Sequence, residues 1–139
     1  MAQGTTTFPT ALDAARTNPS NMDTSEAALL AMQAHRGVLA VYAADGAISP
    51  VAGEAVLTKG SAGAYTLAAP ATDGMRLCIT AGSAFAHVVT ATNLIADGVT
   101  GGAKDTATFG AFVGSSLDLL AYNGLWHVVG KNVVTIAAV

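Results

Sequence analysis

The sequence predicts a mainly β protein: an antiparallel sandwich or barrel of the jelly-roll type, preceded by an extended N-terminal arm and one short helix. Three observations support this fold class. Short runs rich in Val, Leu, Ile, Thr and Tyr recur from about residue 37 to the end of the 139-residue chain. Turn-forming Gly, Asn, Asp and Ser separate these runs at near-regular spacing. Strand and helix patterns do not alternate, so a doubly wound nucleotide-binding fold is not expected.

Residues 1–22 are expected to form the extended arm. This stretch is rich in Thr, Ser, Asn, Gly and Pro, and Pro9 and Pro19 interrupt regular structure within it. An isolated segment of this composition is flexible, and it can become ordered against a partner. Phe8 and Leu12 are the large apolar side chains that the arm offers to such a partner.

Residues 23–36 carry the helix signal. Asp23 can cap the first turn, and Glu26 stands three positions later, as in a capping box. Leu29 and Met32 point away from the main apolar stripe of this helix, so both of its sides are partly apolar. Together with the two arm residues, they are the candidate contacts to neighbouring subunits or to a larger assembly.

The β domain is expected over residues 37–139. Residues 54–59 and 64–68 flank a flexible Gly-Ser-Ala-Gly connection at 60–63, which predicts a β-hairpin with a four-residue loop. A Gly-rich stretch at 93–104 reads as a long loop. Further strands are expected at residues 38–42, 75–80, 86–90, 106–109, 117–122, 125–129 and 133–136.

The strongest local signal is the Asn123-Gly124 pair. A two-residue type I′ turn needs positive φ at both central positions, and Asn followed by Gly satisfies that need. Tyr122 and Trp126 flank this turn. They could form an exposed tip on which a sugar ring stacks, or they could pack against each other across the hairpin, and the packed arrangement is the favoured interpretation.

The composition points to an assembly component. Charged residues make up 11% of the chain and hydrophobic residues 52%, although soluble domains usually carry about 25% charge. A core of this size cannot hide all of the apolar content, so other protein is expected to cover part of it. The net charge of −3 and the absence of a basic run argue against binding to nucleic acid or to an anionic membrane surface. The longest uncharged stretch, 77–96, has a Gly-Ser break and predicts two strands with a turn, not a membrane-spanning helix.

No pattern in the sequence predicts catalysis, a metal site or a cofactor. His35, His87 and His127 have no Cys or carboxylate at metal-ligand spacing, although a zinc site assembled from distant strands or from neighbouring subunits stays open. Cys78 lies in a strand-like run and is expected to be a small buried residue; a reactive thiol or an intersubunit disulfide is the alternative. Ser61 lacks the spacing and the strand-to-helix context of a nucleophile elbow. We therefore do not expect an enzyme.

From about Asp45 to the C-terminus, the chain resembles the capsid decoration (cement) and head-fibre base proteins of tailed bacteriophages. The resemblance is a pattern match without a chemical signature. It is carried by Asp45-Gly46-Ala47-Ile48, by residues 55–59 and 65–70, by Phe85-Ala86-His87-Val88-Val89-Thr90, by residues 105–110, and by residues 119–129.

The resemblance implies a β-rich homotrimer that binds the major capsid protein on the outer surface of a virion, at quasi-threefold positions. The segment before Gly37 does not belong to the shared pattern, and its role as a clasp on the capsid is our own inference. The alternative is a receptor- or carbohydrate-binding module of a phage tail fibre, which exposed aromatic side chains around Trp126 would favour. A partner of either kind is protein or carbohydrate, not nucleic acid or membrane.

Overall fold

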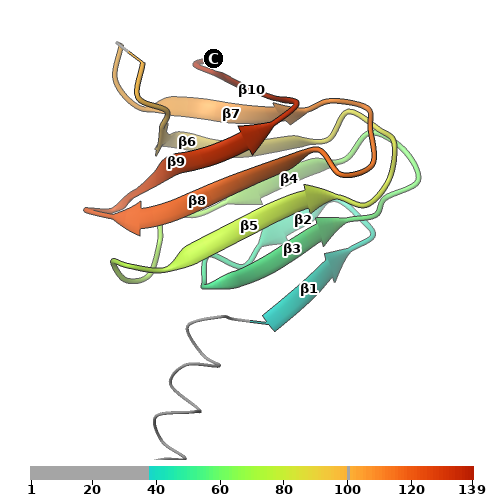
Figure 1. Ribbon diagram of the computed structural model, residues 1–139, viewed down its shortest axis with the longest axis horizontal. Coiled ribbons are helices and arrows are strands. Elements are labelled where there is room, and N and C mark those ends of the chain that lie inside the picture. The colour runs from blue at the N-terminus through green and yellow to red at the C-terminus, as the bar shows by residue number, and fades with distance from the viewer. Residues whose placement is uncertain (1–37, 100) are drawn as a thin grey trace, which may run out of the picture. The chain divides into compact units, whose positions relative to one another are not determined.

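Ten β-strands make up the part of the chain that the computed structural model describes, residues 38–99 and 101–139 (Figure 1). These residues contain no α-helix, so the mainly β prediction is confirmed for them. None of them forms a helix long and apolar enough to cross a membrane. The predicted arm, the predicted helix and their four candidate contacts lie outside the described residues: 1–22, 23–36, Phe8, Leu12, Leu29 and Met32.

The strands are short, as the spacing of the turn residues predicts. Their bounds are β1 (Val38–Tyr42), β2 (Gly46–Ile48), β3 (Gly53–Leu57), β4 (Ala64–Leu67), β5 (Arg76–Ala81), β6 (Val88–Ala96), β7 (Lys104–Phe109), β8 (Ser116–Tyr122), β9 (Leu125–Asn132) and β10 (Val134–Ala137).

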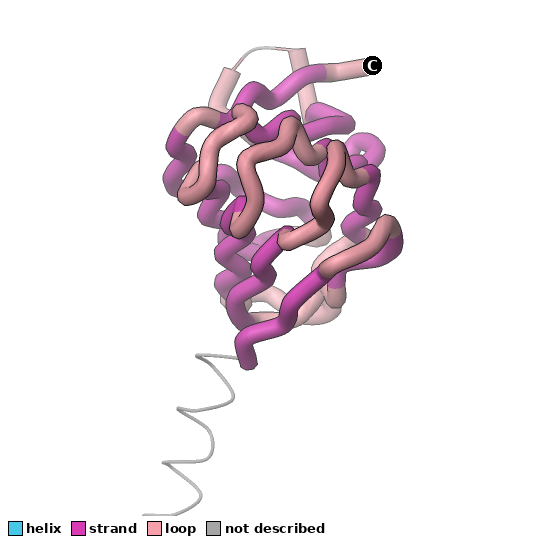
Figure 2. The backbone as a smooth tube through the Cα atoms, turned by 90° about the vertical axis from the view of Figure 1, so that its right-hand side faces the viewer, coloured by secondary structure: helices cyan, strands magenta, loops and turns pink. Residues whose placement is uncertain are grey.

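All ten strands belong to one curled sheet that is nearly closed into a barrel (Figures 1 and 2). Its main path runs β1-β3-β5-β8-β9-β6-β4-β2, and β7 and β10 extend it beside β6. Strands β1 and β2 stand at the two ends of this path. The predicted barrel-like architecture is therefore confirmed.

The pairing directions are mixed, although the sequence predicted antiparallel pairs. Strands β1, β3 and β5 pair in parallel, and so do β2, β4 and β6. Pairs β5–β8, β8–β9, β6–β7 and β7–β10 are antiparallel. The mixture arises because the first six strands alternate between two regions of the curled sheet, so that every second strand runs in the same direction.

The predicted hairpin across residues 60–63 is wrong for the same reason. Strand β3 pairs with β1 and β5, whereas β4 pairs with β2 and β6, so the connection crosses from one region of the sheet to the other. A flexible Gly-rich loop permits a crossing as readily as a tight turn. The Asn123-Gly124 turn does form between β8 and β9, with φ angles of 53° and 74°.

The barrel interior is filled by the alternate residues of the strands. In one row across the sheet, Ala55, Ile79 and Leu117 are neighbours and all three are buried. The adjacent row, Glu54, Cys78 and Asp118, points outward. This two-residue period separates the apolar interior from the polar outer face, as expected for half-buried strands. Trp126, Tyr65 and Phe109 are the largest fully buried side chains.

The predicted long loop at 93–104 is shorter in the structure, because β6 continues to Ala96 through an irregular stretch. Asn93 has a φ of 57° there, and its N–H donates to the Asp105 carboxylate over 2.7 Å. The other oxygen of Asp105 accepts from the N–H of Val139 over 2.8 Å. These two backbone donors hold the pKa of Asp105 below its ordinary value, with Val139 the larger cause.

Candidate functional site

One end of the barrel presents a cluster of exposed apolar side chains, which we call the loop platform. It consists of loop 82–87, loop 110–115 and Val133, and it projects Phe85, Phe112 and Val113. Phe112 and Val113 are 66% and 68% exposed, which is unusual for large apolar side chains on fixed loops. Figure 2 looks onto the end of the barrel where these connections gather.

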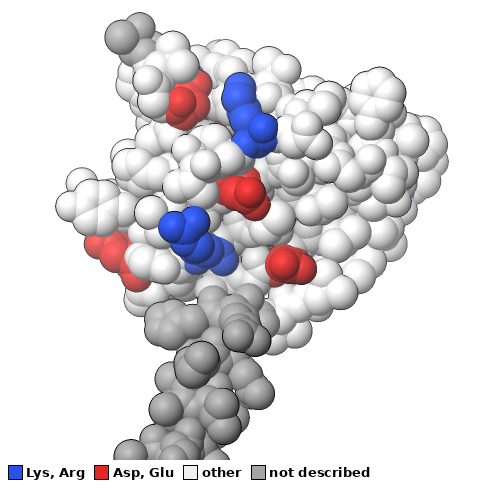
Figure 3. Space-filling model, viewed as in Figure 1, with Lys and Arg blue, Asp and Glu red and all other residues white. Residues whose placement is uncertain are grey.

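The loop platform contains no Asp, Glu, Lys or Arg. On the face drawn in Figure 3, charged side chains gather over the left and the middle, and the right-hand end, toward which these loops project, is almost free of them. Two charged residues in other loops of this end, Asp45 and Lys59, form a salt bridge of 2.8 Å with each other. Lys131, two positions before Val133, is also exposed near the platform.

Backbone hydrogen bonds hold the two loops together. The N–H of Gly114 donates to the carbonyl of Ala81, and the N–H of Ala81 donates to the carbonyl of Ser115, both over 2.8 Å. The N–H of Gly110 donates to the carbonyl of Val133 over 2.8 Å, which joins the β9–β10 turn to the same group. The platform is thus a connected surface and not a set of independent loops.

Ser115 supports loop 110–115 from inside. It is 2% exposed, and its hydroxyl lies 2.9 Å from the carbonyl of Phe112 and 3.1 Å from that of Gly110. A buried hydroxyl shared between two carbonyls of its own loop fixes the turn that displays Phe112. Among the residues that the structure describes, three polar or charged ones are classed as buried: His87, Asp105 and Ser115.

His87 supports loop 82–87. Its ring is fully buried, and its Nδ1 atom accepts the N–H of Gly63 over 3.1 Å. The hydrogen of the neutral ring is therefore on Nε2, which donates to the Ser83 hydroxyl over 2.9 Å. Ser83 in turn donates to the carbonyl of Lys59 over 2.7 Å. Burial, and next the nearby Lys59, lower the pKa of His87, which favours the neutral ring.

This Ser–His pair is oriented against nucleophilic catalysis. A histidine that activates a serine must accept the hydroxyl hydrogen at a bare nitrogen. Here Nε2 carries the hydrogen and Ser83 is the acceptor, because the Gly63 N–H occupies Nδ1. The pair instead joins the connection after β3 to the loop after β5.

The Tyr65 ring packs against the rings of both His87 and Tyr42. The ring of Tyr65 meets that of His87 edge-on at 5.8 Å between centroids and that of Tyr42 at 6.4 Å. Gly63 has no side chain where these rings pack, and a Cβ at that position would lie 2.5 Å from the Tyr65 ring. The buried layer that supports the loops is therefore tightly packed.

We also considered whether Cys78 is a reactive thiol and whether the described side chains could bind a metal ion. Cys78 lies between Glu54 and Asp118 on the outer face, where burial, and next a hydrogen bond with Asp118, raise its pKa to about 11. A thiol with that pKa stays protonated at neutral pH, which disfavours the reactive-thiol alternative. No group of three His, Cys, Asp or Glu side chains within the described ranges could hold a metal ion. His35 lies outside these ranges.

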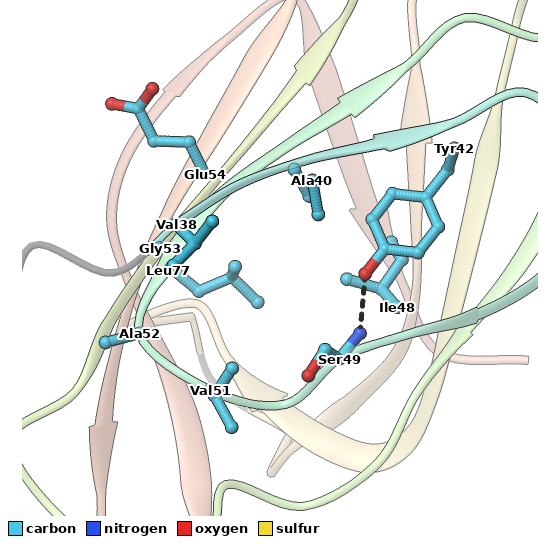
Figure 4. Close-up of a pocket in the computed structure, with 11 residues that line it drawn as sticks. Val38, Ala40, Tyr42, Ile48, Ser49, Val51, Ala52, Gly53, Glu54 and Leu77 are labelled. Atoms are coloured by element: carbon cyan, nitrogen blue, oxygen red, sulfur yellow. Dashed lines mark hydrogen bonds between the residues drawn. The ribbon is translucent and has the colours of Figure 1, made fainter. Parts of the chain in front are cut away.

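A small apolar hollow opens beside β1, between that strand and the segment that leads into β3 (Figure 4). Its volume is about 170 Å³, and Val38, Val51 and Leu77 are among its lining side chains. The Tyr42 hydroxyl accepts the N–H of Ser49 at its inner side over 2.9 Å. Pockets for small-molecule ligands usually measure about 300–1,000 Å³, so this hollow is small for a substrate site.

The exposed-tip prediction is wrong for Trp126. This residue is fully buried, and its indole N–H donates to the carbonyl of Ala68 over 2.9 Å. Tyr122 is 60% exposed, and its ring lies 5.9 Å from that of His127. Tyr122 pairs with Leu125 and Trp126 with Ala121, so the two aromatic residues occupy adjacent rows and point to opposite faces. They therefore form neither a sugar-stacking shelf nor a cross-strand pair.

Sequence reasoning did not identify the loop platform. The available signal was a Phe in each of two uncharged stretches of small residues, Gly82-Ser83-Ala84-Phe85 and Gly110-Ala111-Phe112-Val113-Gly114. Comparison with models of known families and with curated proteins finds no match for the chain. The fold and the platform therefore define the class of protein over the described residues: an all-β unit with exposed apolar side chains at one end.

Proposed function

We propose that the protein is a structural virion protein, a homotrimeric decoration (cement) protein that binds the outer surface of a tailed-phage capsid and stabilises it. The observation that carries this proposal is the loop platform, an uncharged apolar surface on a rigid all-β unit. A surface of this kind is typical of contacts between proteins and is a poor basis for chemistry. The resemblance to phage decoration proteins selects the capsid as the assembly.

The low charge agrees with such a role. A protein that binds only the intact shell stabilises that shell by mass action, without catalysis or a cofactor. Three footings in one trimer bind together through their high effective concentration, so each contact can be weak. No charged recognition patch is then needed on any single subunit.

The test is the copy number of this chain in purified particles, measured by quantitative mass spectrometry against the major capsid protein. A decoration protein is expected at a number comparable to that of the shell subunits. Heating particles with and without the protein then measures the stabilisation, because undecorated shells should release DNA at lower temperature. A few copies per particle, or none, would contradict the proposal.

The alternative is a carbohydrate- or receptor-binding module of a tail fibre. It depended on an exposed aromatic surface around Trp126, which the structure does not provide. Trp126 is buried, and Tyr122 alone gives one exposed ring at the end of β8. A few copies per virion together with measurable sugar binding would restore that alternative.

A further inference from the structure

We propose that the loop platform is the surface at which copies of this chain meet, so that Phe85, Phe112 and Val113 of one subunit pack against its neighbours. This inference rests on the homotrimer of the proposed function and names its interface. The occupant of the platform is thus a second copy of the chain and not the capsid shell.

The distribution of charge favours a second copy. The chain carries a net charge of −3, so the long-range electrostatic interaction between two copies is repulsive on balance. The platform has no charged side chain, and an approach through it avoids like-charge contacts. A surface made for a different protein usually contains charges that complement those of its partner.

The side chains also have the character of a homomeric interface. The buried centres of such interfaces are more apolar than the remaining surface, enriched in aromatic residues and depleted of charge. Phe85 and Phe112 supply the aromatic residues, and Val113 and Val133 extend the apolar area around them. The small residues of both loops permit close approach of the neighbouring backbone.

Hydrogen bonds within the subunit order the two loops of the platform. Ser115 and His87, two of the three buried polar residues in the described part of the chain, form hydrogen bonds that support its two loops from inside. Association of pre-ordered loops loses less conformational entropy than association of mobile ones. An internal hydrogen-bonded frame beneath exposed phenylalanines is expected of a surface that is built to be covered.

The backbone conformation of Val133 is a separate observation that supports the proposed interface. Its φ is 55°, a left-handed conformation that a β-branched residue rarely adopts. Strained backbone of this kind persists where function requires the side chain in that place. Its carbonyl accepts the N–H of Gly110, and its side chain remains 53% exposed beside the loop of Phe112. The strained conformation keeps an apolar side chain on the platform.

The test compares two charge-adding variants of the full chain by analytical ultracentrifugation over a range of concentrations. The variant Phe112→Asp/Val113→Asp places charge on the platform. The control Tyr122→Asp places charge on an equally exposed ring at the far end of β8. The unchanged chain and the control should sediment as trimers, and the platform variant should associate more weakly by about 30-fold or more, as for loss of a central aromatic anchor.

Circular dichroism and thermal unfolding establish whether the platform variant is folded. Hydroxyl-radical footprinting of the unchanged chain provides a test without mutation, because Phe85 and Phe112 should become more reactive when the trimer dissociates on dilution. Unchanged association of a folded platform variant would overturn the inference. A monomeric unchanged chain, or equal reactivity of both phenylalanines in the trimer and the monomer, would overturn it as well.

Capsid binding, measured in parallel, separates this inference from the proposed function. If the platform variant stays trimeric but no longer binds capsids, the platform faces the shell, and the inference fails while the function stands. If the variant loses trimerisation and the unchanged trimer does not bind capsids, the inference stands and the function fails.

Discussion

The N–H of Gly63 donates a hydrogen bond of 3.1 Å to Nδ1 of His87, which lies 24 positions later in the chain. This single contact determines the tautomer of the histidine, directs Nε2–H toward Ser83, and joins the loop after β3 to the loop after β5. With the Ser83 contact, it gives both ring nitrogens of this buried histidine a hydrogen-bond partner. Several properties of the protein should therefore depend on this pair of residues.

Stability should fall as the pH drops below about 6.5, the ordinary pKa of histidine. Because burial lowers the pKa of His87 in the folded state, the unfolded chain takes up a proton at higher pH than the folded chain does. The contribution of His87 is complete above the unfolded value and is lost as the pH falls through the folded value. Urea unfolding from neutral to mildly acidic pH measures this slope. His87→Gln should reduce it.

Gly63→Ala should destabilise the protein by about 1–3 kcal/mol, as overpacking of a core does. Its Cβ would lie 2.5 Å from the Tyr65 ring, which is itself fully buried. The matched control is Gly60→Ala in the same loop, where a Cβ would meet nothing within 4 Å. The control should be neutral or slightly stabilising in urea unfolding. Equal effects of the two substitutions would show that Gly63 is not packed as described.

Trp126→Ala should cost about 3–5 kcal/mol, the usual loss for a fully buried aromatic residue. The substitution also leaves the carbonyl of Ala68 without the indole donor. Tyr122→Ala, at the exposed position, should change the free energy of unfolding by less than about 0.5 kcal/mol. The intrinsic fluorescence of Trp126 should be blue-shifted in the folded state and shift to the red on unfolding. A red emission maximum in the native protein would place the indole in water.

Val133→Gly should stabilise the isolated subunit by about 1 kcal/mol, because glycine adopts a φ of 55° without the steric cost of a β-branched side chain. The measurement is best made in the Phe112→Asp/Val113→Asp background, where association does not contribute. In the otherwise unchanged chain, the same substitution should weaken trimerisation, since it removes an apolar side chain from the platform. A loss of subunit stability in the first experiment would contradict the strain at Val133.

Deletion of residues 1–22 should leave a folded trimer that binds capsids poorly, if this segment is the clasp that we propose. The segment lies outside the described residues, and the hydrophobic core of the β unit is formed by side chains between Ile48 and Val134. Sedimentation measures the trimer, and cosedimentation with purified capsids measures occupancy. As a control, the Tyr122→Asp chain with its arm intact should bind normally. Unchanged occupancy after the deletion would eliminate the clasp.

Local features of the fold could be predicted because their causes are local. The two-residue period of β5 and β8 separates buried from exposed side chains within a single strand, whatever lies beside it. The turn at Asn123-Gly124 depends only on which residues tolerate positive φ. The outward orientation of Asp118, between two buried leucines, follows from the same alternation.

Features that depend on which strands pair with each other, and in which register, could not be predicted in this way. The Gly-rich connection at 60–63 gives the same signal whether it closes a hairpin or crosses the barrel, and only the pairing of β3 and β4 with other strands decides between them. Likewise, an aromatic residue next to a tight turn can face either side of the sheet. The register Ala121–Trp126 directs the indole inward and leaves Tyr122 outside.

The sequence by itself therefore determined that this chain is β-rich and poor in charge, because composition and alternation act residue by residue. Only the tertiary structure decided that Phe85, Phe112, Val113 and Val133 share one end of the barrel, on loops supported by His87 and Ser115. Those residues come from loops that are far apart along the chain. Strand pairing and the hydrogen bonds between loops bring them together, and neither is encoded in any single segment.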